Sequence, residues 1–450
     1  MSNPDIGDEG LRIAIGLPSA VMLVMGGIVG VGIFANPAIV AKGLHSPTLV
    51  LAAWSLGGVV ALLGAFVYAE LAARIPATGG EYVYLRNTYG PLAGFLYGWT
   101  TLFVVQAGGM AAVSIVFAKN LNVLAGGDLA EPAVVVAVLA GLAAVNCVGV
   151  KSGNGMQSVL GLLRIGAIAA LVIAGLLLTP HLPAHHAAPG APMNLWKAFG
   201  AAMIPVVFSY GGWQTASFVA GEIRDPARNL ARALMLGVAA VILLYLLVNI
   251  ACLRALGVEA LGRTLTPTSD VLALSVGPAA GKLAAAAIAL SALAFLSQSM
   301  LTAPRVCFAM ARDGLFFRRI GTVAKGSRAP AAAIILQAAW TGVLALSGGY
   351  DQILSYVVSM NFLFFAVSAS CLFTLRWREA RGAPASAAGF RAPWHPLTTA
   401  AFIAACLAIV GCSFWAYPVN SLIGYAILLM GVPPYLYWRR RRMPEPQIAL

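Results

Sequence analysis

The chain has 450 residues, of which 60% are hydrophobic and only 10% are charged, and its formal net charge is +13. An ordinary soluble domain carries about 25% charged residues, whereas apolar runs of about 20 residues, each long enough to cross a bilayer, recur throughout this sequence. The composition therefore excludes a soluble globular protein, and the lack of residue-by-residue polar alternation excludes a membrane β-barrel.

Twelve apolar runs predict an all-α polytopic membrane protein with twelve transmembrane helices. An even number of spans places both termini on one side, and 20 of the 28 Lys and Arg residues then fall in loops and tails on that side. The positive-inside rule makes that side the cytoplasm. We therefore predict a multi-pass protein of the inner (cytoplasmic) membrane, in contact with the lipid bilayer and with no nucleic-acid partner. The predicted spans lie near 13–41, 47–73, 91–122, 132–150, 155–179, 196–224, 229–257, 279–310, 329–347, 350–376, 396–416 and 419–438.

The first predicted span contains the stretch VMGGIVGVGIFANP, in which four of the seven residues from Gly26 to Gly32 are glycine. Each glycine costs a helix about 1 kcal/mol relative to alanine. Gly26 and Gly30 form a GxxxG pair, so the glycines are either a close-packing face or an unwound midpoint that lines a cavity. This span alone leaves both interpretations open.

The sixth predicted span is also interrupted, by Ser209-Tyr210-Gly211-Gly212, with Pro205 one turn earlier. Spans 1 and 6 are corresponding members of two five-span halves, and interrupted helices at matching positions indicate an inverted-repeat transporter. Because five is odd, the second half enters the membrane in the opposite orientation. The predicted organisation is a cytoplasmic tail at 1–12, five-helix repeats at 13–179 and 194–376, two additional helices at 394–438 and a basic cytoplasmic tail at 439–450.

Two helix ends face the predicted gap in span 1. The half-helix that restarts near Gly32 directs its partly positive N-terminus at the gap, where the N–H groups around Val31 and Gly32 suit a carboxylate. The preceding half-helix ends near Gly26 and Gly27, whose carbonyl groups suit an ammonium group. A zwitterionic amino acid matches both ends, which favours the unwound interpretation.

Spans 1, 3, 6, 8 and 10 carry no Asp, Glu, Lys or Arg at mid-depth, and Glu222 and Arg305 lie near the cytoplasmic ends of spans 6 and 8. A charge inside a membrane is costly and usually functional. Its absence predicts a substrate with an uncharged side chain. Phe208 and Trp213 flank the second break, where they either pack in the core or close over a ligand.

The chain carries no HExxH, GxSxG or P-loop motif, which disfavours a membrane enzyme and a self-contained ATP-driven pump. The six cysteines all fall in apolar runs and are interpreted as small hydrophobic residues. His181, His185 and His186 share one outer loop, which we interpret as solvated rather than metal-binding. No cofactor and no metal are predicted.

Three motifs, GGIVGVGIFANPAIV, YAELAARIPATGGEYVYLRNTYGPLAGFLYGW and FSYGGWQTASFVAGEIRDPARNLARAL, together resemble the amino acid–polyamine–organocation superfamily, and most closely its L-type amino acid transporter branch and bacterial relatives. The resemblance implies a LeuT-type five-plus-five inverted repeat, with helices 1 and 6 unwound at mid-membrane, and alternating access for amino acids. It places a carboxylate-binding turn at 30–32 and a gating aromatic at Phe208. The predicted substrate-binding residues are Ile28, Val29, Gly30, Val31, Gly32, Phe208, Ser209, Tyr210, Gly211 and Trp213.

Three positions depart from the family pattern. Val31 replaces a serine, so a hydroxyl donor is lost while the backbone donors remain, and Gln214 replaces an asparagine. Relatives often carry a lysine in span 5, near where sodium sits in coupled cousins, and Arg164 takes that position here. A guanidinium effectively cannot release its proton. Arg164 is therefore either a permanent tethered cation beside Ser297 and Ser299, or a side chain that snorkels to the cytoplasmic surface.

Eukaryotic members of this family join a partner through a cysteine in the loop between spans 3 and 4. The corresponding loop, NVLAGGDLAEP, has no cysteine, so no disulfide-linked heavy subunit is expected. The leading prediction is a secondary transporter (permease or exchanger) of neutral L-amino acids that works by alternating access. The alternatives are an amine or cationic amino acid permease of the same superfamily and a membrane sensor on a transporter scaffold.

Overall fold

The computed structural model describes residues 13–148, 150–178, 194–264, 267–277, 279–324, 329–347, 350–382, 389–416 and 418–441. Within these residues every regular element is a helix, and one isolated backbone bridge joins Ile15 to Ile223. The predicted all-α fold class is therefore confirmed.

The described part of the chain is built of α-helices, π-helices and 3-10 helices. The α-helices are α1 (Leu17–Ile28), α2 (Gly32–Leu44), α3 (Pro47–Arg74), α4 (Glu81–Tyr89), α5 (Pro91–Thr100), α6 (Gln106–Ala125), α7 (Glu131–Val148), α8 (Val150–Ile173), α9 (Leu195–Tyr210), α10 (Pro226–Arg263), α11 (Pro267–Val276), α12 (Ala280–Thr302), α13 (Pro304–Arg312), α14 (Ala331–Ser347), α15 (Tyr350–Ala380), α16 (Leu397–Ala416), α17 (Pro418–Leu429) and α18 (Val432–Arg441). The π-helices are η1 (Thr101–Val105) and η2 (Ala174–Leu178), and the 3-10 helices are η3 (Trp213–Glu222) and η4 (Arg318–Gly321).

Local sequence signals mark where several helices begin. The Ser46 side chain accepts a hydrogen bond from the Leu49 amide at the start of α3, and Asn194 does the same for the Lys197 amide at the start of α9. Such side chains satisfy backbone N–H groups that have no partner within the helix. Proline stands in the first turn of α3, α5 and α10, where its missing N–H costs nothing.

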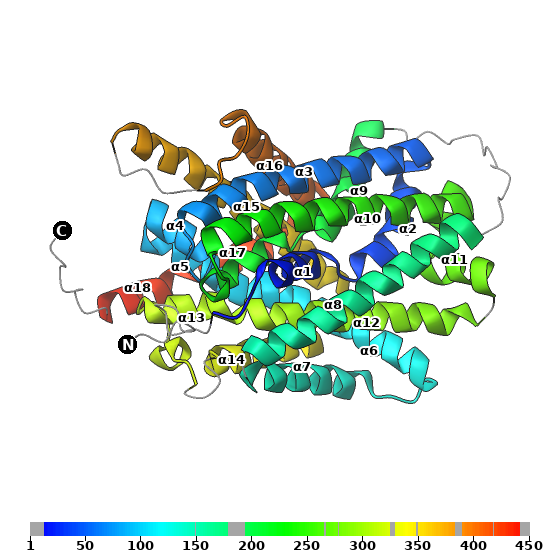
Figure 1. Cartoon of the computed structure of the whole chain (residues 1–450), viewed down its shortest axis with the longest axis horizontal. Coiled ribbons are helices and arrows are strands. Elements are labelled where there is room, and N and C mark those ends of the chain that lie inside the picture. Colours follow the sequence, from blue (N-terminus) through cyan, green and yellow to red (C-terminus); the bar gives the residue numbers. More distant parts are fainter. Residues whose placement is uncertain are drawn as a thin grey trace.

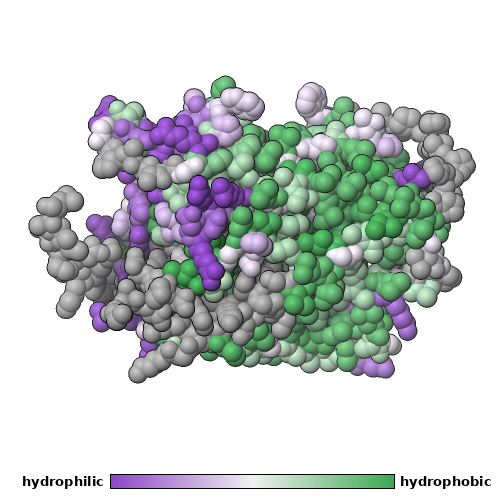
Figure 2. Space-filling view, in the orientation of Figure 1, coloured by the Kyte–Doolittle hydropathy of each residue, from purple (hydrophilic) through white to green (hydrophobic). Residues whose placement is uncertain are grey.

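The long helices run side by side along the longest axis of the molecule (Figure 1). Hydrophobic residues cover the middle of the surface over α8 and α10, and hydrophilic residues gather toward the ends (Figure 2). In the described part of the chain, nine helices are long and apolar enough to cross a membrane, and the bent pair α1 and α2 makes a tenth if it is one span. The chain is therefore a multi-pass membrane protein.

Two groups of helices meet around the first span. In the first group, α10 lies against α1, α2 and α3, and α9 lies against α2 and α3. In the second group, α12 lies against α6 and α8, and α6 also lies against α14. α1 also contacts α8 and α12, so it lies where the two groups meet.

Candidate substrate site

The first span is interrupted where its glycines gather. α1 ends at Ile28, Val29 is extended (φ −71°, ψ 102°), and α2 begins at Gly32 after a bend of 42°. No side chain caps the start of α2. The Phe34 N–H donates to the Val31 carbonyl oxygen at 3.1 Å, whereas the N–H groups of Gly32 and Ile33 have no backbone partner among the described residues, and the helix dipole makes this end partly positive. The break can therefore accept an anionic group.

Gly212 turns the chain at the second break, between α9 and η3. Its φ of +106° lies in the left-handed region, and a Cβ there would lie 2.0 Å from the Gly27 carbonyl oxygen. A Cβ on Gly27 would in turn lie 2.4 Å from the Gly212 carbonyl oxygen. Real Cβ atoms do not approach so closely, so both positions require glycine. The backbones of the two breaks are thus in direct contact.

The side chain of Arg164 on α8 lies against the C-terminal end of α1. Its side chain is completely buried, and Nη1 donates hydrogen bonds to the carbonyl oxygens of Gly26 at 3.2 Å and Val29 at 2.5 Å. The Gly26 carbonyl, which we expected to receive an ammonium group, accepts from Arg164 instead. Arg164 does not snorkel to a surface, and it makes no hydrogen bond with Ser297 or Ser299 in the described structure.

A second set of buried hydrogen bonds ties the two breaks together. The Tyr245 hydroxyl on α10 lies 3.2 Å from the Ile28 carbonyl oxygen and 3.1 Å from that of Ser209. The Asn36 amide on α2 donates to Ser209 Oγ at 2.7 Å and to the Pro205 carbonyl oxygen at 3.0 Å. The Tyr245 hydroxyl thereby reaches two carbonyl groups next to the interruptions, as a low-dielectric interior requires, and Asn36 joins α2 to α9.

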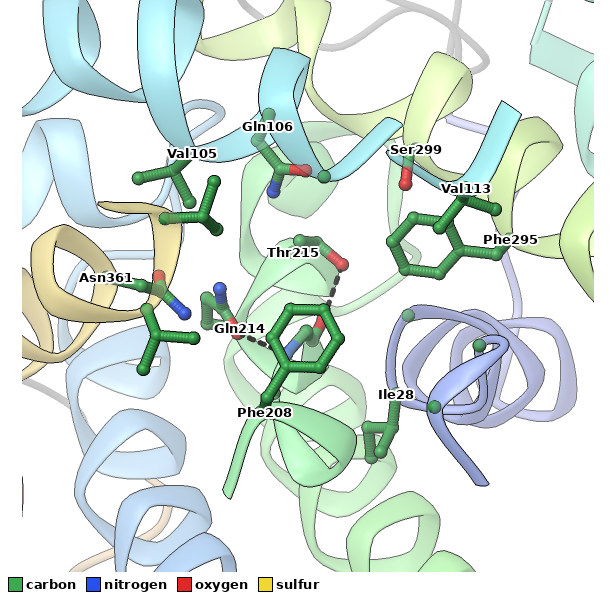
Figure 3. A pocket seen from close by; sticks show the side chains of 18 of the residues that line it. Ile28, Val105, Gln106, Val113, Phe208, Gln214, Thr215, Phe295, Ser299 and Asn361 are labelled. Carbon is green, nitrogen blue, oxygen red and sulfur yellow. Dashed lines mark hydrogen bonds between the residues drawn. The ribbon is translucent and has the colours of Figure 1, made fainter. Parts of the chain in front are cut away.

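A cavity of about 80 Å³ lies between the breaks and the second group of helices. In Figure 3 the ring of Phe208 lies in the middle of this space, with Asn361 on one side, Phe295 on the other and Gln106 above. The lining residues are Gly27, Ile28, Gly30, Val31, Gly32, Val105, Gln106, Gly109, Val113, Val207, Phe208, Gly211, Gly212, Gln214, Thr215, Phe295, Gln298, Ser299, Val357, Val358, Asn361 and Phe362.

The residues predicted for the site from sequence divide into two groups. The structure places the first group on the cavity wall and the second behind it. The lining group is Ile28, Gly30, Val31, Gly32, Phe208, Gly211 and Ser299. The group outside the lining is Val29, Arg164, Ser209, Tyr210, Trp213 and Ser297.

The rings of Tyr210 and Trp213 point away from the cavity into aromatic packing. Tyr210 lies 5.0 Å from Tyr245 between ring centroids, and Trp213 lies 4.7 Å from Tyr68 in an edge-to-face arrangement. Such pairs stabilise a core beyond their buried area. These two residues therefore shape the second break through their backbone rather than lining the site with their rings.

Several lining side chains were missed by the sequence analysis. Gln106, Gln298 and Asn361 bring amide groups from α6, α12 and α15, and Gln298 donates to Thr215 Oγ1 at 2.7 Å. Their signal was present, since a polar side chain within an apolar span is usually functional. Gln106 also follows the π-helix η1, and single π turns within α-helices are common at functional sites.

No Asp, Glu, Lys or Arg is among the residues that line the cavity. Glu222 and Arg305, which the sequence places near the ends of spans 6 and 8, pair with each other at 2.8 Å, and both side chains are completely buried. Among the described residues, no group of three His, Cys, Asp or Glu side chains could hold a metal ion. His181, His185 and His186 lie outside the described residues.

Comparison with known proteins gives consistent matches over nearly the whole chain. A family model described as amino acid permease matches residues 15–433. The serine/threonine exchanger SteT of Bacillus subtilis is 30% identical over 97% of this chain and 99% of its own length. The large neutral amino acids transporter small subunit 2 of Mus musculus is 28% identical over 97% and 83%, respectively, and the mouse Asc-type amino acid transporter 1 is 26% identical over 96% and 82%.

Proposed function

The chain belongs to the amino acid permease family of transporters, and from this premise we propose that it exchanges neutral L-amino acids across the cytoplasmic membrane by alternating access. It is a transporter and not an enzyme. The observation that carries the proposal is the pairing of a free helix N-terminus at Gly32 with a cavity whose lining has no charged side chain. A carboxylate would find donors there, and a charged substrate side chain would find no counter-ion.

The proposed architecture has twelve spans in a LeuT-type five-plus-five inverted repeat, followed by two further helices. The matching interruptions of α1/α2 and α9/η3 support it, because they stand at the first position of each proposed half. We also propose that the end of the molecule with α4, α13 and α18 (Figure 1) faces the cytoplasm, together with both termini. The arginines of these helices support that orientation.

In the proposed complex, the N–H groups around Val31 and Gly32 hold the substrate carboxylate. Because the Gly26 and Val29 carbonyls already accept from Arg164, and the Ile28 carbonyl lies within hydrogen-bond distance of Tyr245, the ammonium group is placed on carbonyls at the end of α9, near Val207. This arrangement sets the negative group at a helix N-terminus and the positive group at a helix C-terminus. The substrate side chain then extends toward α6 and α15.

The dimensions and lining of the cavity favour a small substrate. A volume of about 80 Å³ holds roughly five to eight water molecules, since one water needs about 10–15 Å³. The amides of Gln106 and Asn361 face this space beside Val105 and Val357. We propose small neutral amino acids, with or without a side-chain hydroxyl, as the best substrates. A serine/threonine exchanger among the relatives supports this choice.

The decisive experiment is counterflow with the purified full chain in proteoliposomes. Vesicles are loaded with one unlabelled compound and exposed to a trace of the same compound carrying a radiolabel. The panel contains serine, threonine, alanine, leucine, lysine, glutamate and the amine putrescine. Exchange confined to neutral amino acids supports the proposal. Exchange of putrescine or lysine alone would favour the amine or cationic permease, and binding without exchange of any compound would favour a sensor.

We expect the purified chain to exchange substrate without a partner subunit, because the loop 122–132 offers no cysteine for a disulfide. The large neutral amino acids transporter small subunit 2, which is among the relatives, carries the words small subunit in its name, so a partner requirement is the alternative that this experiment tests. The measurement is counterflow by the monodisperse single chain. Activity that appears only after a second protein is co-expressed would contradict it.

Phe208→Ala is expected to lower exchange at least about tenfold. The half-buried ring stands in the cavity, so its removal opens the space above the substrate carboxylate and ammonium. Because the ring is only partly packed, stability should fall by less than the roughly 3–5 kcal/mol of a fully buried phenylalanine. The measurements are initial counterflow rate and melting temperature.

The matched control is Phe414→Ala, since Phe414 is also half-buried but packs against Tyr425, outside the cavity lining. It should lose similar stability and keep its exchange rate. An unchanged rate in Phe208→Ala would assign Phe208 to packing alone.

A further inference from the structure

Glu81 is a buried carboxylic acid outside the membrane spans. It is the first residue of α4, between the end of α3 at Arg74 and the start of α5 at Pro91, and only 1% of its surface is exposed. Gly80 precedes it with a φ of +52°, which turns the chain inward at this point. The site described above does not use this side chain.

The two oxygens of Glu81 accept hydrogen bonds from two tyrosines on different helices. The Tyr68 hydroxyl donates to Oε1 at 2.5 Å and the Tyr97 hydroxyl donates to Oε2 at 2.6 Å. No Lys, Arg or His among the described residues forms an ion pair with it. The titratable groups that face it are neutral near physiological pH; they are Tyr68 on α3, Tyr84 on α4, Tyr97 on α5, Cys371 on α15 and Cys406 on α16.

The neighbouring acids at this end of the molecule, unlike Glu81, form ion pairs with arginines. Glu70 pairs with Arg74 and Arg376, and Glu222 pairs with Arg305. Burial without such a cation raises the pKa of Glu81 to about 7, although the two tyrosine hydroxyls act in the opposite direction. Glu81 therefore takes up or releases a proton at pH values near neutrality.

The carboxyl joins the two groups of helices that meet around the substrate cavity. Tyr68 belongs to α3, which lies against α9 and α10. Tyr97 belongs to α5, which continues through η1 into α6, and α6 lies against α12 and α14. The ring of Tyr68 also packs on Trp213, the first residue after the second break. A movement of one group against the other therefore changes the surroundings of Glu81.

We propose that Glu81 is a proton-binding switch that holds the α4 end of the transporter closed when protonated and favours its opening when ionised. The inference rests on the proposed alternating access. In the closed end, the neutral acid is favoured because the carboxyl is buried. When that end opens, water reaches the carboxyl and stabilises its charge. The proton enters and leaves on the same side of the membrane, so it alters the rate of exchange and drives no accumulation.

The sign and size of the effect follow from linkage. With a pKa of about 7 in the closed end and about 4.5 when hydrated, lowering the pH from 8 to 6 raises the closed-to-open ratio about tenfold. If opening of this end limits exchange, the rate should fall up to about tenfold over the same range. The midpoint should lie near pH 7.

The test is counterflow by the full chain in proteoliposomes, with the same pH on both sides, from pH 5.5 to 8.5. The wild type should slow as the pH falls, and Glu81→Gln, which keeps the shape without the charge, should show a flat profile. Tyr97→Phe removes one donor to the carboxylate and should move the midpoint to higher pH. This second variant decides the question if Glu81→Gln does not fold.

Two controls carry titratable or charged groups elsewhere on the same surface. Burial lowers the pKa of His395, whose Nδ1 lies 2.9 Å from Thr399 Oγ1, and Glu379 pairs with Arg74 and Arg391. His395→Gln and Glu379→Gln should both keep the wild-type midpoint.

Superimposable profiles of wild type and Glu81→Gln, or faster exchange at low pH, would overturn the switch while leaving the transporter proposal intact. A wild type that exchanges nothing at any pH would overturn both.

Discussion

Gly32→Val is expected to reduce exchange on the order of 100-fold while the protein still reaches the membrane as a monodisperse species. A Cβ on Gly32 would lie 2.9 Å from Ser209 Oγ and 3.1 Å from the Asn36 side-chain nitrogen, so a valine displaces the bond that joins α2 to α9. Its branches also cover the N–H groups proposed to hold the carboxylate. Loss of two charge-assisted hydrogen bonds, at roughly 1.5 kcal/mol each, the lower end of their usual range, accounts for the factor.

The matched control is Gly43→Val, in the last turn of α2 and outside the cavity lining, where an added Cβ meets no atom of the described residues within 4 Å. It should keep most of the exchange rate. The measurements are counterflow, substrate-induced shift of the melting temperature, and elution profile. If Gly32→Val aggregates and Gly32→Ala exchanges normally, Gly32 serves close helix packing and the carboxylate assignment is wrong.

Arg164→Met is expected to abolish exchange. The substitution leaves the Gly26 and Val29 carbonyl groups without their donor, and an unsatisfied buried group costs about 1–3 kcal/mol. It also removes the cation that offsets the partly negative C-terminus of α1. Lys282→Met, which removes an exposed cation at the start of α12, is the control and should exchange like the wild type.

The role of Arg164 as a fixed cation has a separate test in imposed gradients. A guanidinium keeps its proton, so we propose that the site needs no sodium and carries no proton. Wild-type vesicles should therefore exchange substrate without accumulating it under a sodium or pH gradient. Arg164→Lys restores a donor but introduces an amine that can titrate when buried, so partial activity with a new pH dependence is expected. Gradient-driven accumulation by the wild type would refute the fixed cation.

The sequence predicted the interruptions correctly because glycine carries a direct signal. Gly27 and Gly212 must be glycine because their backbones are in contact, and a Cβ at either position would clash with the other residue's carbonyl oxygen. The sequence left two positions open for Arg164, and the structure, in its described part, shows it buried against the break in span 1, without a hydrogen bond to Ser297 or Ser299. The helical class followed from composition alone.

Side-chain direction was not predictable in the same way. Tyr210 and Trp213 flank the second break in sequence, but both rings lie against neighbouring helices. Tyr210 ends α9 and packs against Tyr245 on α10, whereas Trp213 begins η3 after the turn at Gly212 and packs against Tyr68 on α3. The π-helix η1 likewise shifts the register of the third predicted span, so Gln106 faces the cavity. Rotation about a helix axis depends on tertiary packing, which a single sequence does not contain.

The contact between Gly27 and Gly212 bears on how the two interrupted helices can travel. The backbones of the two breaks are in contact, and hydrogen bonds from Tyr245 and Asn36 join one break to the other. These contacts hold the two breaks in a fixed position relative to each other. We propose that in an alternating-access cycle the two breaks turn together as one rigid body. A bound amino acid would then move with the two breaks, relative to the opposite wall of the cavity on α6, α12 and α15. Its side chain would contact that wall again in each transport cycle, so the wall would contribute to selectivity in every cycle.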